Sequence, residues 1–262
     1  MKPVTSTIFN IRDEVSFKEK ALELFHYQAN HNKVYASYLQ NLRIHPDEVN
    51  ELTRIPFIPI EFFKSHQLIT GDEESREVFT SSGTTGMTQS KHYVTDVKLY
   101  EESYLRAFEQ FYGNVEDYCI LALLPSYLER NGSSLIYMAD DLIRRSNHPD
   151  SGFYLHNYDE LLVKLKQLEN KNQQTILLGV TYSLLDIAEL YVSGNYPPLQ
   201  HTIIMETGGM KGKRKEMIRE DLHHRLCSSF GVTSIHSEYG MTELLSQAYS
   251  KGMGRFKCPP WM

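Results

Sequence analysis

Cysteine is scarce in this sequence of 262 residues, whose three cysteines, Cys119, Cys227 and Cys258, lie far apart. No CxxC pair exists, so neither a zinc site nor a disulfide framework is indicated. A basic excess is also missing, because the net charge is −6. A general nucleic-acid binder would show such an excess, so nucleic acid is not an expected partner.

Long hydrophobic runs are absent as well. The longest one, Cys119 to Leu124, is far too short to span a bilayer, and the first 20 residues lack the apolar core of a signal peptide. A reduced, cytoplasmic location is therefore the default expectation, with no membrane span. Hydrophobic residues make up 41% and charged residues 23%, which is ordinary for a globular protein. The sequence leaves open whether the chain forms a homo-oligomer.

Apolar runs of strand length alternate with helical patterns through most of the chain. Residues 16–42 are expected to be helical, and residues 1–55 are predicted to form a helical N-terminal segment ahead of a core domain at 56–262. After Asp96, which can cap a helix, strands are expected at 118–124, 175–180, 201–206 and 232–236, with amphipathic helices between them. This alternation predicts an α/β fold with a mainly parallel sheet and helices on both faces.

One segment between two strand-like runs, 76–80 and 90–95, is crowded with hydroxyl groups and glycine. It reads Thr80, Ser81, Ser82, Gly83, Thr84, Thr85, Gly86. Phosphate oxygens need many donors at short range; glycine lets the backbone curl around them, and Ser and Thr add hydroxyl donors. No lysine follows Gly86 directly, so this is not a Walker loop. Phosphate binding and a tight hairpin turn both remain open.

A second segment, SEYGMTE at 237–243, follows the last predicted strand. Glu243 offers a carboxylate for magnesium, Thr242 a donor for a phosphate oxygen, and Tyr239 an aromatic face for a base. The alternative is a strand–turn–helix, with the turn at Gly240 and the first helical turn at Thr242. Each predicted strand is followed by a segment rich in hydroxyl groups or glycine. Because ligands bind at the carboxyl ends of parallel strands, these segments together predict a site.

Taken together, TSSGTTG and the later YGMTE resemble the motifs of the adenylate-forming enzymes, the acyl-CoA synthetase and luciferase superfamily. Within that group the stretches LLPSYLERNGSSLIYMADDLI (123–143) and TGGMKGKRKEM (207–217) are most similar to the LuxE type of acyl-protein synthetase. The resemblance covers roughly residues 50–262. It implies the fold of the superfamily's large N-terminal domain, with the small C-terminal lid domain missing and the chain apparently truncated before it.

The resemblance also implies a reaction. A carboxylic acid, expected to be a fatty acid, is activated by ATP and Mg²⁺ to acyl-AMP and pyrophosphate, and the acyl group then passes to a protein thiol. An acyl-acceptor or reductase protein is the implied partner. Two alternatives remain: a phenylacetate-type acyl-CoA ligase, and a non-catalytic nucleotide-binding remnant, since the superfamily's ribose aspartate and C-terminal lysine are not in this chain.

The matched motifs assign roles to residues. Thr242, Glu243 and Lys91 are the expected catalytic residues, although Lys91 comes two residues later than the superfamily's lysine, and Glu243 is also the expected magnesium ligand. The phosphate loop would consist of Thr80, Ser81, Ser82, Gly83, Thr84, Thr85 and Gly86. The remaining cofactor-binding residues would be Gly208, Gly209, Glu238, Tyr239 and Gly240.

Overall fold

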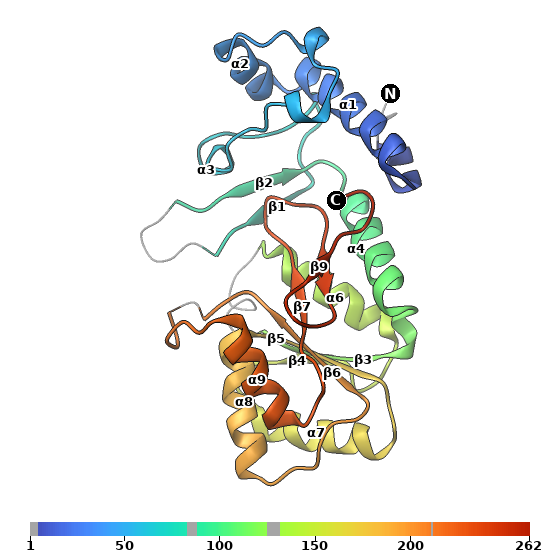
Figure 1. The fold of residues 1–262 in the computed structure, drawn as a ribbon, viewed down its shortest axis with the longest axis vertical. Helices are drawn as coiled ribbons and strands as arrows, with labels where there is room; N and C mark the ends of the chain where they lie inside the picture. The colour runs from blue at the N-terminus through green and yellow to red at the C-terminus, as the bar shows by residue number, and fades with distance from the viewer. Residues whose placement is uncertain (1–4, 83–87, 125–131, 211) are drawn as a thin grey trace.

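The computed structural model describes residues 5–82, 88–124, 132–210 and 212–262. Four residues of the expected phosphate loop, Gly83, Thr84, Thr85 and Gly86, lie outside these ranges. At one end of the molecule are the N-terminal helices, and at the other a large sheet with its covering helices (Figure 1). A small hairpin lies between them. No helix in the described part of the chain is long and apolar enough to cross a membrane.

The N-terminal helices have a small core of their own. They comprise η1 (Thr5–Asn10), α1 (Glu14–His31), α2 (Lys33–Asn41), η2 (Pro46–Glu48), η3 (Leu52–Arg54) and α3 (Phe62–Ser65). A capping box starts α1, because Asp13 accepts from the Ser16 backbone N–H and Ser16 accepts from that of Asp13. Phe25, Tyr35 and Leu39 are buried in a cluster separate from the main core. The boundary at residue 55 stays a prediction.

The main sheet has seven strands in the order β4-β3-β5-β6-β7-β8-β9. The five from β4 to β7 pair in parallel, and β8 and β9 are antiparallel to their neighbours. The predicted mainly parallel α/β sheet is therefore confirmed. The bounds are β3 (Cys119–Leu123), β4 (Gly152–Tyr154), β5 (Thr175–Val180), β6 (Thr202–Thr207), β7 (His236–Tyr239), β8 (Ala248–Ser250) and β9 (Phe256–Lys257).

Helices cover both faces of this sheet, as predicted. Figure 1 shows α7, α8 and α9 gathered on one side and α4 and α6 on the other. Every residue of β3 and β5 is buried, which is why these strands read as continuous apolar runs. The covering elements are α4 (Val97–Tyr112), η4 (Val115–Asp117), α6 (Ser134–Ser146), α7 (Tyr158–Asn170), α8 (Thr181–Ser193) and α9 (Arg219–Phe230).

Caps visible in the sequence set the start of two of these helices. The Asp96 side chain accepts from the backbone N–H of Lys98 at the start of α4, and that of Ser133 accepts from Ile136 at the start of α6. The aromatic stripe on α4 points inward, with Tyr100 and Tyr104 almost fully buried. The strand predicted at 232–236 is wrong by several residues, because the chain pairs as β7 only from His236 onward.

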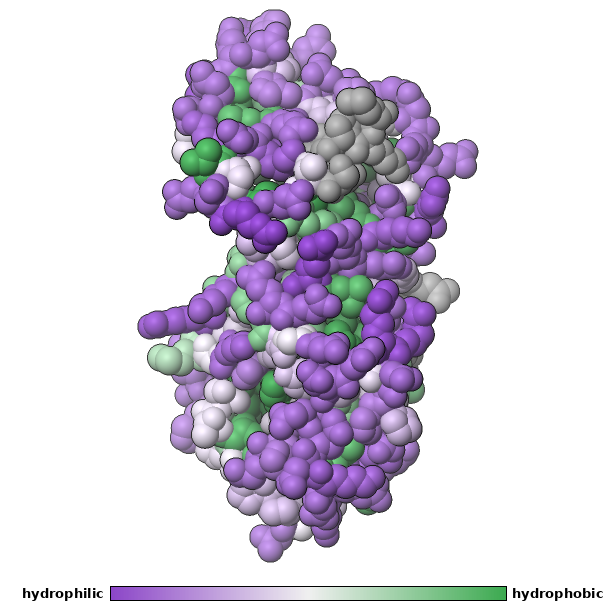
Figure 2. All heavy atoms as spheres, turned by 90° about the vertical axis from the view of Figure 1, so that its right-hand side faces the viewer, coloured by the Kyte–Doolittle hydropathy of each residue, from purple (hydrophilic) through white to green (hydrophobic). Residues whose placement is uncertain are grey.

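The hairpin of β1 (Glu77–Thr80) and β2 (Lys91–Val94) is antiparallel and lies beside the carboxyl ends of the parallel strands (Figure 1). It is tied there by a bond from the Thr80 N–H to the carbonyl of Gly132 (2.7 Å). The hydroxyl-rich segment after β1 is thereby brought to the edge where ligands bind in such sheets. Figure 2 shows that the face toward the right of Figure 1 is hydrophilic over most of its area, with small separate hydrophobic areas.

Candidate active site at the carboxyl edge of the sheet

A cavity of about 620 Å³ lies where the hairpin meets the carboxyl ends of β6 and β7. Residues from both sequence motifs line it, although more than 150 positions separate them in the chain: Ser81 and Ser82 on one side, Thr242 and Glu243 on the other. Of the other predicted site residues, the cavity is lined by Thr80, Gly208, Glu238 and Gly240. The structure therefore brings most of the described predicted residues into one place.

Three predicted residues lie elsewhere. Lys91 lines a second, smaller hollow of about 410 Å³ beside α3, which adjoins the first through the shared residue Gln89. Tyr239 does not line the cavity; the residue is 43% exposed, and its hydroxyl lies 3.0 Å from the sulfur of Met241. Gly209 is exposed in the loop after β6. Whether these residues approach a bound nucleotide stays a prediction.

The segment carrying Thr242 and Glu243 is a turn, so the alternative reading, a helix start at Thr242, is not formed. The turn closes with a bond from the Leu244 N–H to the Met241 carbonyl (3.0 Å). Both Thr242 and Glu243 are half-buried and keep part of their surface open toward the cavity. Such a turn leaves the hydroxyl and the carboxylate available for a ligand, whereas a helix start would engage the hydroxyl in capping.

His92 on β2 joins the two motifs. Its Nδ1 lies 2.9 Å from the carbonyl oxygen of Thr242, and because a carbonyl only accepts, Nδ1 carries the proton. Burial lowers the pKa of His92, against the opposing effects of this hydrogen bond and of the charge of Glu243. The imidazole is therefore neutral at pH 7. His92 was not among the predicted site residues, because its only signal in the sequence is its position in the strand after the hydroxyl-rich segment.

Glu238 is a buried carboxyl group on the cavity wall. Its Oε2 accepts from the hydroxyl of Thr207 (2.6 Å), the last residue of β6. Burial raises the pKa of Glu238 to about 7. The hydrogen bond from Thr207 opposes this increase, and the charge of the nearby Glu206 adds to it. The other oxygen, Oε1, faces the backbone of Gly240, where an added Cβ would lie only 2.8 Å from it. An alanine at position 240 would therefore require the carboxyl group of Glu238 to shift.

Tyr100 and Gln247 form the inner wall and were not predicted as site residues. The Tyr100 hydroxyl donates to the Ser134 carbonyl (3.1 Å) and accepts from Nε2 of Gln247 (3.0 Å). The helical spacing of α4 indicated only that Tyr100 faces inward. Gln247 is 147 positions from Tyr100 in the sequence, and no local sequence pattern predicts their contact. Other lining residues outside the prediction are Gln89, Ser133, Leu135, Thr207 and Met241.

The hydroxyl and carboxylate groups that line the cavity fit a nucleotide phosphate with bound Mg²⁺. Magnesium is usually held by one or two carboxylates together with substrate phosphates and water, and Glu243 supplies one carboxylate beside the hydroxyls of Ser81 and Ser82. Among the described residues there is no group of three or more His, Cys, Asp or Glu side chains that could hold a metal by itself.

The sequence model of the LuxE family, described as acyl-protein synthetase, matches residues 10–262. The chain belongs to the LuxE acyl-protein synthetase family. A curated relative of this LuxE-family chain is the long-chain-fatty-acid–luciferin-component ligase of Photorhabdus luminescens. It is 35% identical over 71 residues, which cover 27% of this chain and 60% of that protein.

Two solved structures of a 2-hydroxyisobutyryl-CoA ligase have the same fold as this LuxE-family chain. An open conformation with 2-HIB-AMP and CoA has a TM-score of 0.60 at 11% identity, over 88% of this chain and 50% of that one. The thioesterification state, with the same two molecules, has a TM-score of 0.62 at 12% identity, over 95% and 53%. The chain thus spans about half the length of these ligases. The adenylate-forming fold predicted from the motifs is confirmed.

Proposed function

We propose that this chain carries the adenylation site of an ATP-dependent, AMP-forming acid ligase that passes its acyl group to a protein thiol. The observation that carries the proposal is the single cavity lined by Ser81, Ser82, Thr242 and Glu243. Membership of the acyl-protein synthetase family supports it. The name of the Photorhabdus relative makes a long-chain fatty acid the first substrate to test.

In the proposed first step a carboxylate oxygen attacks the α-phosphorus of ATP, and the bond to the bridging oxygen breaks to release pyrophosphate. In the second step a thiolate attacks the acyl carbon and AMP leaves. The hydroxyls of Ser81 and Ser82 would donate to the β- and γ-phosphate oxygens and that of Thr242 to the α-phosphate. Glu243 would hold Mg²⁺, which neutralises phosphate charge when bound. Placement and charge neutralisation are the main demands of this chemistry.

Pyrophosphate exchange tests the first step. With a fatty acid and Mg²⁺ present, the protein should exchange labelled pyrophosphate into ATP, and Glu243→Ala should slow that exchange roughly 100-fold or more. The control is Glu220→Ala, which removes an exposed carboxylate from α9, away from the cavity. An exchange rate unchanged by Glu243→Ala would remove the metal assignment. Direct titration with ATP gives a readout that does not depend on turnover.

A labelled acid tests the second step. After incubation with ATP, the label is expected on protein, either on this chain or on an added acceptor protein. Label found on CoA instead would favour the acyl-CoA ligase alternative. Binding of ATP without any acid-dependent exchange, for a series of acids of different length, would favour a nucleotide-binding remnant.

A further inference from the structure

The loop after β6 forms one wall of the cavity and has no regular structure of its own in its described residues. It runs from Gly208 to Ile218, where α9 begins. Gly208 lines the cavity, and both Gly208 and Gly212 have positive φ, at 71° and 69°. A glycine-containing segment of this kind has many accessible conformations. Contacts outside the loop must therefore select the one that completes the wall.

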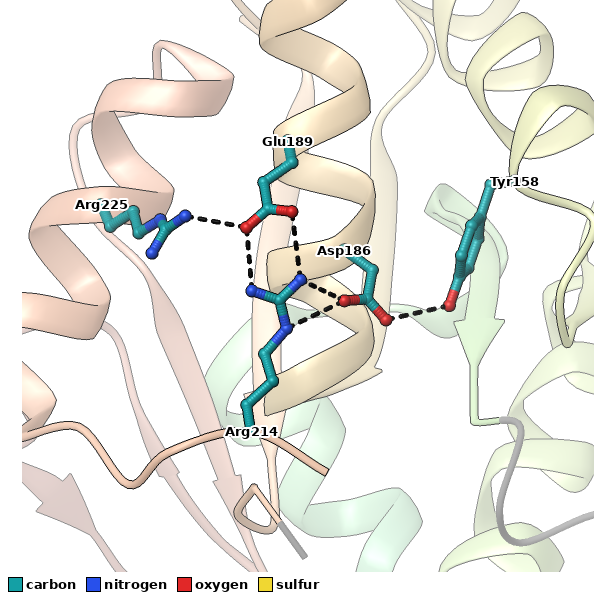
Figure 3. Close-up of polar contacts among 5 residues, drawn as sticks. All are labelled: Tyr158, Asp186, Glu189, Arg214 and Arg225. Carbon is teal, nitrogen blue, oxygen red and sulfur yellow. Dashed lines mark hydrogen bonds and ion pairs between the residues drawn. The ribbon is translucent and has the colours of Figure 1, made fainter. Parts of the chain in front are cut away.

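Arg214 makes the strongest of these contacts (Figure 3). Its Nε donates to Oδ1 of Asp186 (2.9 Å), to which Nη2 is also bonded. Its Nη1 and Nη2 donate to the two carboxylate oxygens of Glu189, at 2.8 and 3.1 Å. Asp186 and Glu189 are three residues apart on α8 and so share one helix face. One guanidinium group thus joins the loop to two carboxylates of α8.

Two further helices also contact those carboxylates. Tyr158 at the start of α7 donates to Oδ2 of Asp186 (3.4 Å), and Arg225 on α9 donates to Oε1 of Glu189 (2.8 Å) (Figure 3). The Arg214 side chain keeps only 28% of its surface exposed. The network therefore differs from an isolated surface ion pair, for which two long side chains must be ordered for one contact.

Helix α8 also holds the cavity end of the loop. Thr181, its first residue, donates its hydroxyl to the carbonyl of Gly208 (3.1 Å). Between the two attachments Met210 is buried in the main core. Arg214 itself lies ahead of α9 and is ion-paired with Asp186 and Glu189.

We propose that Arg214 is a positioning residue for the nucleotide site: it fastens the loop to α8, so that Gly208 already forms its part of the cavity wall before a nucleotide binds. The proposal rests on the proposed function. A preorganised wall avoids the entropic cost of ordering the loop when a nucleotide binds. Loss of the Arg214 contacts should therefore weaken the affinity for the nucleotide. Lysine cannot replace arginine here, because an ammonium group has only three donors and lacks the planar fork that makes these four bonds to two carboxylates.

The test compares Arg214→Met and Arg214→Lys with Arg225→Met in the full chain. Arg225→Met removes a partner of Glu189 and leaves the loop attached, so it is the matched control for general destabilisation. We expect both Arg214 variants to bind ATP about tenfold more weakly by titration calorimetry, which corresponds to about 1.4 kcal/mol, with the exchange rate at saturating ATP retained. Amide hydrogen exchange in peptides covering 207–218 should become faster in these variants and stay unchanged in the control.

The outcomes separate this inference from the proposed function. Faster amide exchange with unchanged ATP affinity in the Arg214 variants would refute the positioning role alone. An equal loss of affinity in Arg225→Met would show a general loss of stability and would also refute it. A wild-type chain that binds no ATP would refute the proposed function and the inference with it.

Discussion

The buried carboxyl group of Glu238 should make the stability of this protein depend on pH in an unusual direction. Burial raises its pKa from 4.5 to about 7, so the folded state favours the protonated form. The resulting stabilisation is fully present below pH 4.5 and is lost as the pH rises through 7. A shift of this size corresponds to roughly 3 kcal/mol, at about 1.4 kcal/mol for each pH unit.

Replacing Glu238 with glutamine removes this titration and keeps an acceptor for the Thr207 hydroxyl. The free energy of unfolding of Glu238→Gln, minus that of the wild type, should therefore increase by roughly 3 kcal/mol between pH 4.5 and pH 8. Urea unfolding at a series of pH values measures this difference, in which the titration of all other groups largely cancels.

A second variant tests the cause of the shift. The Thr207 hydroxyl bond lowers the pKa of Glu238 and so opposes the effect of burial. Thr207→Val removes that donor from a buried position of similar shape, so stability should continue to fall at a higher pH than in the wild type. A difference between Glu238→Gln and wild type that stays constant from pH 4.5 to 8 would show that Glu238 is not desolvated, and the account of the cavity wall would be wrong.

Two further predictions concern the same cavity. Gly240→Ala places a Cβ 2.8 Å from Oε1 of Glu238 and should lower the free energy of unfolding by about 1–3 kcal/mol, as measured in urea. In a Glu238→Ala background most of that loss should disappear. A loss that persists there would point to backbone strain instead. His92→Ala leaves the Thr242 carbonyl without its 2.9 Å partner and should cost about 1–3 kcal/mol as well as slowing pyrophosphate exchange. A rate of pyrophosphate exchange equal to that of the wild type would mean that the hydrogen bond from His92 does not position Thr242.

Local sequence determined most of the elements. Continuous apolar runs such as 119–123 and 175–180 form the central strands because both faces of a parallel sheet are covered. Helical spacing marked both α4 and α6, and the capping residue Asp96 marked the start of α4. The two motifs also pointed to the chemistry, since the residues that hold phosphate and magnesium must be of a few types. The strands β4 and β8 escaped prediction because three residues carry no periodicity, and pairing with a neighbour defines them.

Only the tertiary structure decided which residues meet. Strand alternation directs Lys91 and Tyr93 toward the hollow beside α3, so a residue matched by motif does not line the main cavity. The contacts from Gln247 to Tyr100, from His92 to Thr242 and from Arg214 to Asp186 join segments 28 to 150 positions apart. Such pairs depend on how the layers pack and leave no trace in local spacing. The sequence therefore shows which chemical groups are present, and packing decides which of them share a site.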